Sequence, residues 1–116
     1  MSSLTLVRAG GAVYALPGDR VRAVRARRVR EAPPSLVPGA PTPASARVLE
    51  LDTADGPRVF AVEPTVELAA IDDEGLLPLP PLVTRATPRF AALAAFLDRP
   101  AVLVIDPDQL HEEDGP

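Results

Sequence analysis

Acidic side chains and a single histidine are the groups that could support metal or acid–base chemistry in this chain. His111 is the only histidine, and acidic residues follow it at 112–114. A metal site needs several strong ligands held on rigid elements, which an acidic chain end does not supply. The acidic run at 72–74 precedes Gly75, a pattern more typical of a solvated turn than of a general acid–base pair. We therefore expect neither a metal site nor acid–base catalysis.

The sequence also lacks the patterns that nucleophilic catalysis and phosphate binding require. The chain has no cysteine, which excludes thiolate nucleophiles, thiolate metal sites and disulfides. The serines lie near the N-terminus or in the proline-rich stretch 32–45, with no histidine in any motif to activate them. Gly10 and Gly11 are not followed by a helix start with a lysine, so they do not form a phosphate-binding loop. The sequence therefore predicts a protein that is not an enzyme and holds no cofactor.

The strongest local signal is a run of arginines between residues 20 and 30. Residues 1–47 carry a net charge of +6 and residues 48–116 a net charge of −10. Such a layout favours oriented docking on a protein partner, unless the two halves simply pair with each other on folding. The run is also the best case for binding nucleic acid, but aromatic residues make up only 3% of the chain and leave almost no platform for base stacking.

The elements that must position these groups are short and extended. The chain has 15 prolines among 116 residues, which excludes a mostly helical fold because an interior proline breaks a helix. Gly10 with Gly11 predicts a two-residue hairpin turn between strands expected at 4–7 and 12–16. Asp55 with Gly56 predicts a turn between strands expected at 47–52 and 58–62. We expect a strand with an irregularity near 23–26 within residues 20–31, followed by an extended linker at 32–45.

The remaining segments continue the pattern of short strands. We expect strands at 65–71 and 101–105, an extended segment at 76–83, a turn at 72–75, and either a short helical turn or a strand at 89–97. About eight short strands with very little helix predict an all-β fold, a small barrel or a sandwich. No signal peptide pattern opens the chain, and its longest uncharged apolar run is at 90–97, so we expect a cytoplasmic protein.

The order of these elements resembles the CheW-like domain, the double small β-barrel adaptor of bacterial chemosensory arrays. The stretches that carry the resemblance are VYALPGDRVRAV, VEPTVELAAI, LLPLPPL and RFAALAAFLDRPAVLVIDPDQL. The residues that fall on matching positions are Tyr14, Ala15, Leu16, Val21, Val24, Glu67, Leu68, Ile71, Pro78 and Pro80. The likeness spans nearly the whole chain, and the short length is most similar to the short CheW-like member of the Frizzy motility system.

The sequence departs from the family pattern between Ala40 and Arg47. PTPASA stands there in place of a longer stretch that contributes two strands to the family's first barrel. The resemblance therefore predicts a CheW-like double small β-barrel with a truncated first barrel and an open strand edge. The single domain 1–116 would comprise a reduced first sub-barrel at 1–31, a proline-rich connection at 32–46, a second sub-barrel at 47–110 and an acidic tail at 111–116.

The resemblance implies a non-enzymatic adaptor that links chemoreceptor signalling tips to a histidine kinase. The missing strands put coupling to a CheA-like kinase in doubt and leave a full-length CheW homologue as a further partner. The residues expected to bind the partner are Leu16, Val21, Val24 and Val29. Two alternatives remain open: a small arginine-rich barrel that binds RNA, and an interaction module that pairs with itself by strand addition at an open edge.

Overall fold

The first hairpin of the chain belongs to a six-stranded sheet. In the computed structural model, which describes residues 1–110, β1 (Ser2–Ala9) and β2 (Ala12–Pro17) pair antiparallel. Gly10 and Gly11 join them with φ angles of 61° and 81°, the left-handed values that a type I′ turn requires. The hairpin expected around these glycines is confirmed. The second edge of β1 pairs antiparallel with β6 (Val66–Ile71).

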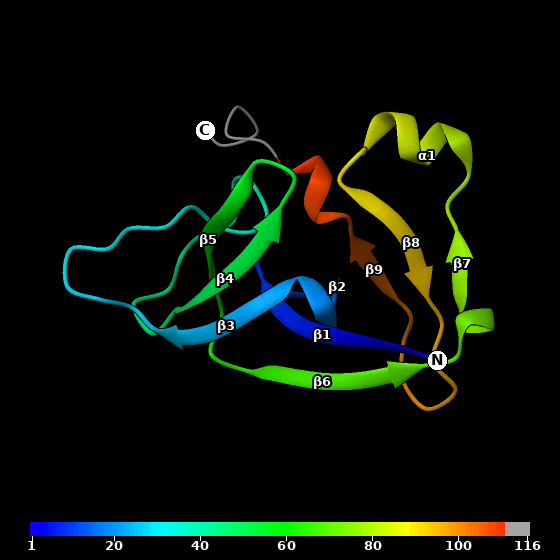
Figure 1. Ribbon diagram of the computed structural model, residues 1–116, viewed down its shortest axis with the longest axis horizontal. Coiled ribbons are helices and arrows are strands. Elements are labelled where there is room, and N and C mark those ends of the chain that lie inside the picture. Colours follow the sequence, from blue (N-terminus) through cyan, green and yellow to red (C-terminus); the bar gives the residue numbers. More distant parts are fainter. Residues whose placement is uncertain (111–116) are drawn as a thin grey trace.

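The other half of this sheet comes from the C-terminal part of the described chain. β7 (Leu76–Pro78), β8 (Phe90–Ala94) and β9 (Val102–Ile105) complete the order β6-β1-β2-β9-β8-β7. β9 lies parallel to β2, and the other pairs are antiparallel. Figure 1 shows β6 at the lower edge and β7 at the opposite edge of this sheet. The strands expected at 65–71 and 101–105 are therefore present.

A second sheet contains only three strands, in the order β3-β4-β5. β3 (Val21–Ala26) pairs with β4 (Arg47–Thr53), which forms a hairpin with β5 (Gly56–Val62). Gly56 has a φ of 101°, which explains why glycine is needed at this turn. The register of β3 shifts between Val21 and Ala23, so the expected irregular strand is confirmed with its bulge slightly earlier than predicted.

Strand pairing divides the chain differently from the split into sub-barrels at 1–31 and 47–110. Residues 1–31 supply β1 and β2 to the six-stranded sheet but β3 to the three-stranded sheet. Residues 47–110 likewise supply strands to both sheets. The physical reason is that β1 has two edges to satisfy, and a strand from the second half covers the one that β2 leaves free. The boundary between the two sheets is therefore not a boundary in the sequence.

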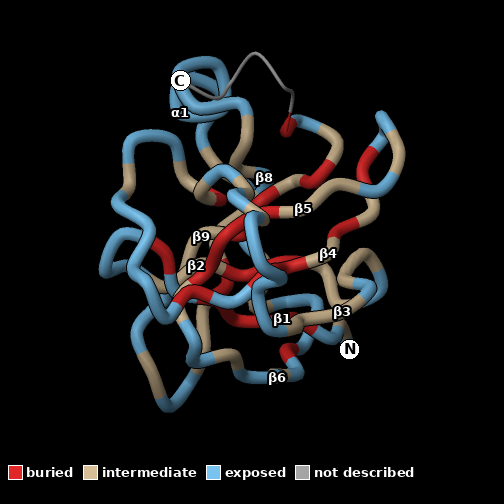
Figure 2. The backbone as a smooth tube through the Cα atoms, turned by 90° about the vertical axis from the view of Figure 1, so that its left-hand side faces the viewer, coloured by how far each residue is buried: buried red, intermediate tan, exposed pale blue. Residues whose placement is uncertain are grey.

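The hydrophobic core consists of two clusters, one on each side of the six-stranded sheet. Along β1, Leu4 and Leu6 join one cluster, whereas Val7 and Ala9 join the other. This alternation follows from the two-residue period of a strand. The cluster of Val7 also contains Leu49 of β4, so it lies between the two sheets. Figure 2 shows the buried residues gathered in the central strands and the exposed ones in the peripheral loops.

Helical structure is limited to short segments. α1 (Pro81–Ala86) begins with proline at its first position, where the fixed φ suits a helix and the missing N–H is not needed. The extended segment expected at 76–83 is therefore wrong beyond residue 80, and the open choice at 89–97 resolves to strand β8. The short 3-10 helices are η1 (Gly18–Arg20), η2 (Asp73–Gly75) and η3 (Pro107–Gln109).

The acidic tail expected at 111–116, with His111, lies outside the described residues. Within residues 1–110, no helix has the length and apolar character needed to cross a bilayer.

The turn between β1 and β2 gives a test of the packing of the proline-rich connection. A methyl group added at Gly10 would lie 3.0 Å from the Cβ of Ala40, whereas one added at Gly11 meets nothing within 4 Å. Both glycines have left-handed φ, so either alanine variant loses roughly 1–2 kcal/mol of stability from backbone strain. We expect Gly10→Ala to lose more than Gly11→Ala in urea unfolding. Equal losses would show that the contact with residue 40 does not constrain the turn.

Candidate partner-binding surface

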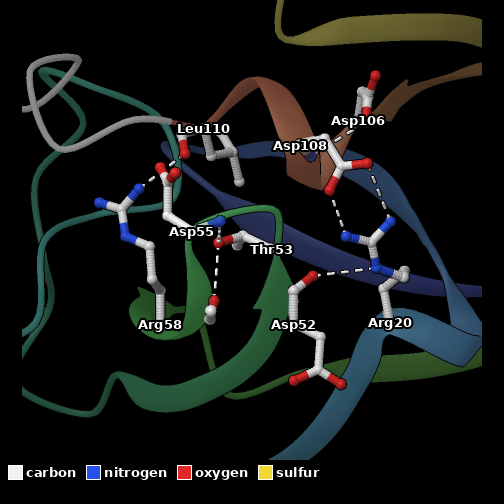
Figure 3. A network of polar contacts seen from close by, with 9 residues as sticks. Arg20, Asp52, Thr53, Asp55, Arg58, Asp106, Asp108 and Leu110 are labelled. Atoms are coloured by element: carbon white, nitrogen blue, oxygen red, sulfur yellow. Dashed lines mark hydrogen bonds and ion pairs between the residues drawn. The ribbon is translucent and has the colours of Figure 1, made fainter.

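Arg20, at the end of η1, joins the two sheets at their junction. Its Nε donates to the carbonyl oxygen of Asp52 at 3.1 Å, and its two Nη atoms donate to the two carboxylate oxygens of Asp108. Figure 3 shows this fork between strand β4 and helix η3. The side-chain hydrogen bonds raise the pKa of Arg20 and lower the pKa of Asp108. A bidentate arginine–carboxylate pair of this kind gives geometric specificity as well as attraction.

Helix η3 is held against the three-stranded sheet from its other end as well. The side chain of Asp106 accepts a hydrogen bond of 3.0 Å from the backbone N–H of Asp108 and so caps the helix. Arg58 of β5 donates from Nη1 to the carbonyl oxygen of Leu110 at 2.8 Å. These contacts bind groups of the chain to one another, so we assign this network a structural role.

Arg25, on β3, is the centre of a second ionic cluster. Its two Nη atoms donate to the two oxygens of Glu31 at 2.8 and 2.7 Å, and its Nε donates to Glu50 at 2.6 Å. Arg22 lies 3.6 Å from a carboxylate oxygen of Asp52. Together with Arg20, these arginines pair mainly with acids of the second half of the chain. For this part of the arginine run, the interpretation that the two halves pair on folding is confirmed.

The rest of the run forms a loop at 27–32, which Figure 1 shows projecting from the end of β3. Glu31 closes this loop: its carboxylate accepts from the backbone N–H of Arg28 at 3.0 Å, and its own N–H donates to the Arg28 carbonyl at 3.1 Å. Arg30 adopts a left-handed φ of 67°, a conformation that costs a non-glycine residue about 1 kcal/mol or more. Residues 27–32 line an open depression of about 490 Å³.

Two properties make this loop a candidate for contact with a partner. Val29 is 93% exposed, and Arg27 and Arg30 form no ion pair with any residue in 1–110. An apolar side chain is therefore presented among positive charges that are not neutralised within the described chain. Arginine is enriched at protein interfaces, and an exposed apolar side chain beside it adds area that a partner can bury.

The structure separates the residues expected to bind a partner. Leu16 is 0% exposed and belongs to the cluster between the sheets, so its place in the expected set is corrected: its side chain cannot touch a partner. Val21 and Val24 lie together on β3, half-buried against the same cluster. Val29 lies beyond the end of that strand, on the exposed loop. Both faces of β2 are covered, with Ala15 in one cluster and Leu16 in the other, and the sequence pattern did not reveal that the second face would be covered as well.

Several exposed apolar side chains were not among the expected site residues. Leu68 on β6 is 82% exposed, Leu82 on α1 is 74% exposed, and Leu97 is fully exposed. No sequence signal marked Leu68 as exposed, because the two-residue period of a strand places it on the face opposite the charged Glu67. In the described part of the chain, no group of three or more histidine, cysteine or acidic side chains could hold a metal ion.

The fold of two small, packed β-sheets places this chain in a known class of architecture. It is similar to the crystal structure of the scaffolding protein TtCheW from Thermoanaerobacter tengcongensis, with a TM-score of 0.72. The similarity covers 96% of this chain and 92% of that chain at 16% sequence identity. The expected all-β, CheW-like small-barrel fold is thereby confirmed. No protein-family model and no curated protein matches the sequence.

The ion pair that closes the 27–32 loop predicts a pH dependence of stability. Hydrogen bonds from Arg25 and from the N–H of Arg28 lower the pKa of Glu31 from 4.5 to about 2. A depressed pKa in the folded state stabilises the protein above the ordinary value, and this contribution is lost as the pH falls toward 2. We expect Glu31→Gln to unfold more easily than the parent at pH 7, and the difference to shrink between pH 4.5 and about pH 2.

Urea unfolding at a series of pH values measures this difference directly. Glu74→Gln is the matched control, because the Glu74 side chain forms no hydrogen bond or ion pair with residues 1–110. A difference between parent and Glu31→Gln that stays constant down to pH 2 would contradict the assigned role of this carboxylate.

Proposed function

We propose that this chain is a non-enzymatic, CheW-like adaptor that docks on the signalling tip of a bacterial chemoreceptor. The observation that carries the proposal is the likeness to a CheW scaffolding protein over 96% of the chain. Fold alone does not define function, so the proposal also rests on the exposed apolar and cationic surface at and beyond β3. On this proposal the protein acts in the cytoplasm, within a chemosensory signalling complex that serves motility.

The proposed contact surface combines β3 with the loop that follows it. Val21 and Val24 offer half-buried apolar anchors on a strand held by its pairing with β4, and Val29 adds an exposed anchor. A receptor's helical hairpin would bury these side chains, and a few such anchors commonly carry most of the binding energy. Leu16 supports this surface from beneath by packing in the same cluster.

Coupling to a histidine kinase belongs to the same proposal. The three-stranded sheet ends at β3, with no further strand beyond it in the described chain. A CheA-like kinase or a full-length CheW homologue would contact the chain on this reduced side. An accessory adaptor of this kind, comparable with the short CheW-like member of the Frizzy system, would occupy receptors without recruiting the kinase as strongly as a full-length adaptor.

The surface is tested by titrating purified variants against a receptor signalling-tip fragment. We expect Val21→Arg and Val29→Asp each to weaken binding about tenfold or more, since each removes an apolar anchor and adds a solvated charge. Val29→Asp cannot disturb the core because Val29 is exposed, and circular dichroism checks the fold of Val21→Arg. Leu82→Asp, an exposed apolar residue on α1, is the control that should bind normally. Full binding by both β3-side variants would exclude this surface.

A second candidate function is RNA binding through the same loop. It is favoured by Arg27 and Arg30, which lack ion-pair partners in residues 1–110, and opposed by the scarcity of aromatic side chains. Phosphate contacts release counterions, so RNA affinity would fall steeply with salt. We expect no measurable binding of a single-stranded RNA oligonucleotide at 150 mM salt. A steep salt dependence that Arg27→Gln and Arg30→Gln abolish would favour the RNA function instead.

A further inference from the structure

The two sheets leave four outer strand edges in the described chain, and three of them are protected. The outer edge of β5 is covered: Ala61 donates its N–H to the Pro34 carbonyl at 2.8 Å, and Leu36 donates to the Ala61 carbonyl at 3.3 Å. β7 has three residues and ends at Pro78. β3 carries the bulge at its start and the charged Arg22 and Arg25. Short length, proline, bulges and charges are the usual protection of sheet edges.

β6 is the exception among these edges. It has six residues, contains no proline, and keeps an unbroken register with β1 from Val66 to Ile71. Its free edge forms no backbone hydrogen bond with any residue in 1–110 beyond the ladder to β1. Figure 1 shows β6 at the lower border of the molecule, with no strand beyond it. An unpaired row of N–H and C=O groups is a template for one kind of ligand, an extended strand.

The side chains of β6 favour pairing rather than oppose it. Leu68 is 82% exposed in the middle of the strand. The only charged residue of β6 is Glu67, and Arg99 of the same chain lies 2.9 Å from its carboxylate. Arg99 is held in turn above the ring of Phe96 at 5.4 Å. The charge that would repel a second β6 strand is therefore compensated within each copy.

We propose that β6 pairs antiparallel with β6 of a second copy of this chain, about a two-fold axis, so that one continuous sheet spans both copies. The proposal goes beyond the adaptor function and uses a different surface from β3 and its loop. A two-fold axis places the same strand against itself and satisfies both free edges with one contact. It also brings two Leu68 side chains close together, whereas a helical partner would leave the backbone groups of the edge unpaired. The self-pairing edge thus lies on β6 and not on the reduced sheet.

Mass in solution is the first test. We expect sedimentation equilibrium to show a monomer–dimer equilibrium that tightens as salt increases, because each copy carries a net charge of −4 and salt screens the repulsion between copies. Leu68→Arg should weaken the dimer about tenfold or more, since it sets two positive charges against each other across the edge. Leu82→Arg, the matched control on α1, should leave the dimer unchanged. A monomer at all concentrations, or an unchanged dimer in Leu68→Arg, would overturn the proposal.

Disulfide trapping tests the strand geometry. Because the chain has no cysteine, every cross-link must come from the introduced residue. Single cysteines are placed in turn at positions 66–70. We expect cross-linking to be most efficient at the residue through which the two-fold axis passes and less efficient at the positions on either side of it. The reason is that directly opposed residues of antiparallel strands have the Cα spacing that a disulfide needs. Leu82→Cys, exposed on α1 and away from β6, should not cross-link. Cross-linking at residue 82 as efficient as at β6 would show association through an apolar patch and overturn strand pairing.

The two proposals can fail separately. Leu68→Arg should bind the receptor fragment as the parent does, because β6 is not part of the β3 surface, whereas Val29→Asp should dimerise normally. If the receptor fragment does not bind a dimeric parent, the adaptor proposal is wrong, while the proposal of β6 pairing still holds. A strand from another protein that binds a monomeric parent at β6 would contradict self-pairing.

Discussion

The structure depends on the double burial of β1. Its inward-facing residues alternate between two clusters, with Leu4 and Leu6 on one side and Val7 and Ala9 on the other. Both of its edges are also paired, one with β2 and one with β6. A strand in this position needs apolar residues on both faces and no proline; β1 supplies Leu4 and Leu6 on one face and Val7 and Ala9 on the other, and contains no proline. Val7 and Ala9 pack against the three-stranded sheet, whereas Leu4 and Leu6 are buried among residues of the six-stranded sheet itself, and burial of apolar area is the main driving force of folding.

Electrostatics orders the surface around this core. The arginines at 20, 22 and 25 are used within the molecule, where they hold η3, β4 and the loop after β3 in place. Beyond the end of β3, Arg27 and Arg30 form no ion pair with any residue in 1–110. The same residue type thus has two roles in one short stretch, and the division between them falls where β3 stops pairing with β4. Partly exposed pairs of this kind contribute more to geometry than to stability, because solvent screens them.

In residues 1–110, the exposed apolar side chains lie at the periphery of the sheets, on β6, α1 and the loops. The proposed receptor surface beyond β3 and the proposed strand pairing at β6 belong to different sheets, so both can be occupied in one assembly.

Local signals in the sequence determined the hairpins and the all-β class, whereas they did not show that Leu36, in the proline-rich stretch, would be buried in the core. Gly10, Gly11 and Gly56 predict turns because glycine readily adopts the left-handed φ that tight turns require. Proline excludes a helix wherever a backbone N–H is required. Tertiary structure decided which strands share a sheet, why Leu16 is buried, and which arginines form no ion pair within residues 1–110. These outcomes depend on contacts between segments far apart in the chain, such as β1 with β6 and Arg20 with Asp108. A residue's own type does not encode the partner that packing brings to it, and for that reason only the folded chain shows which edge and which loop are available.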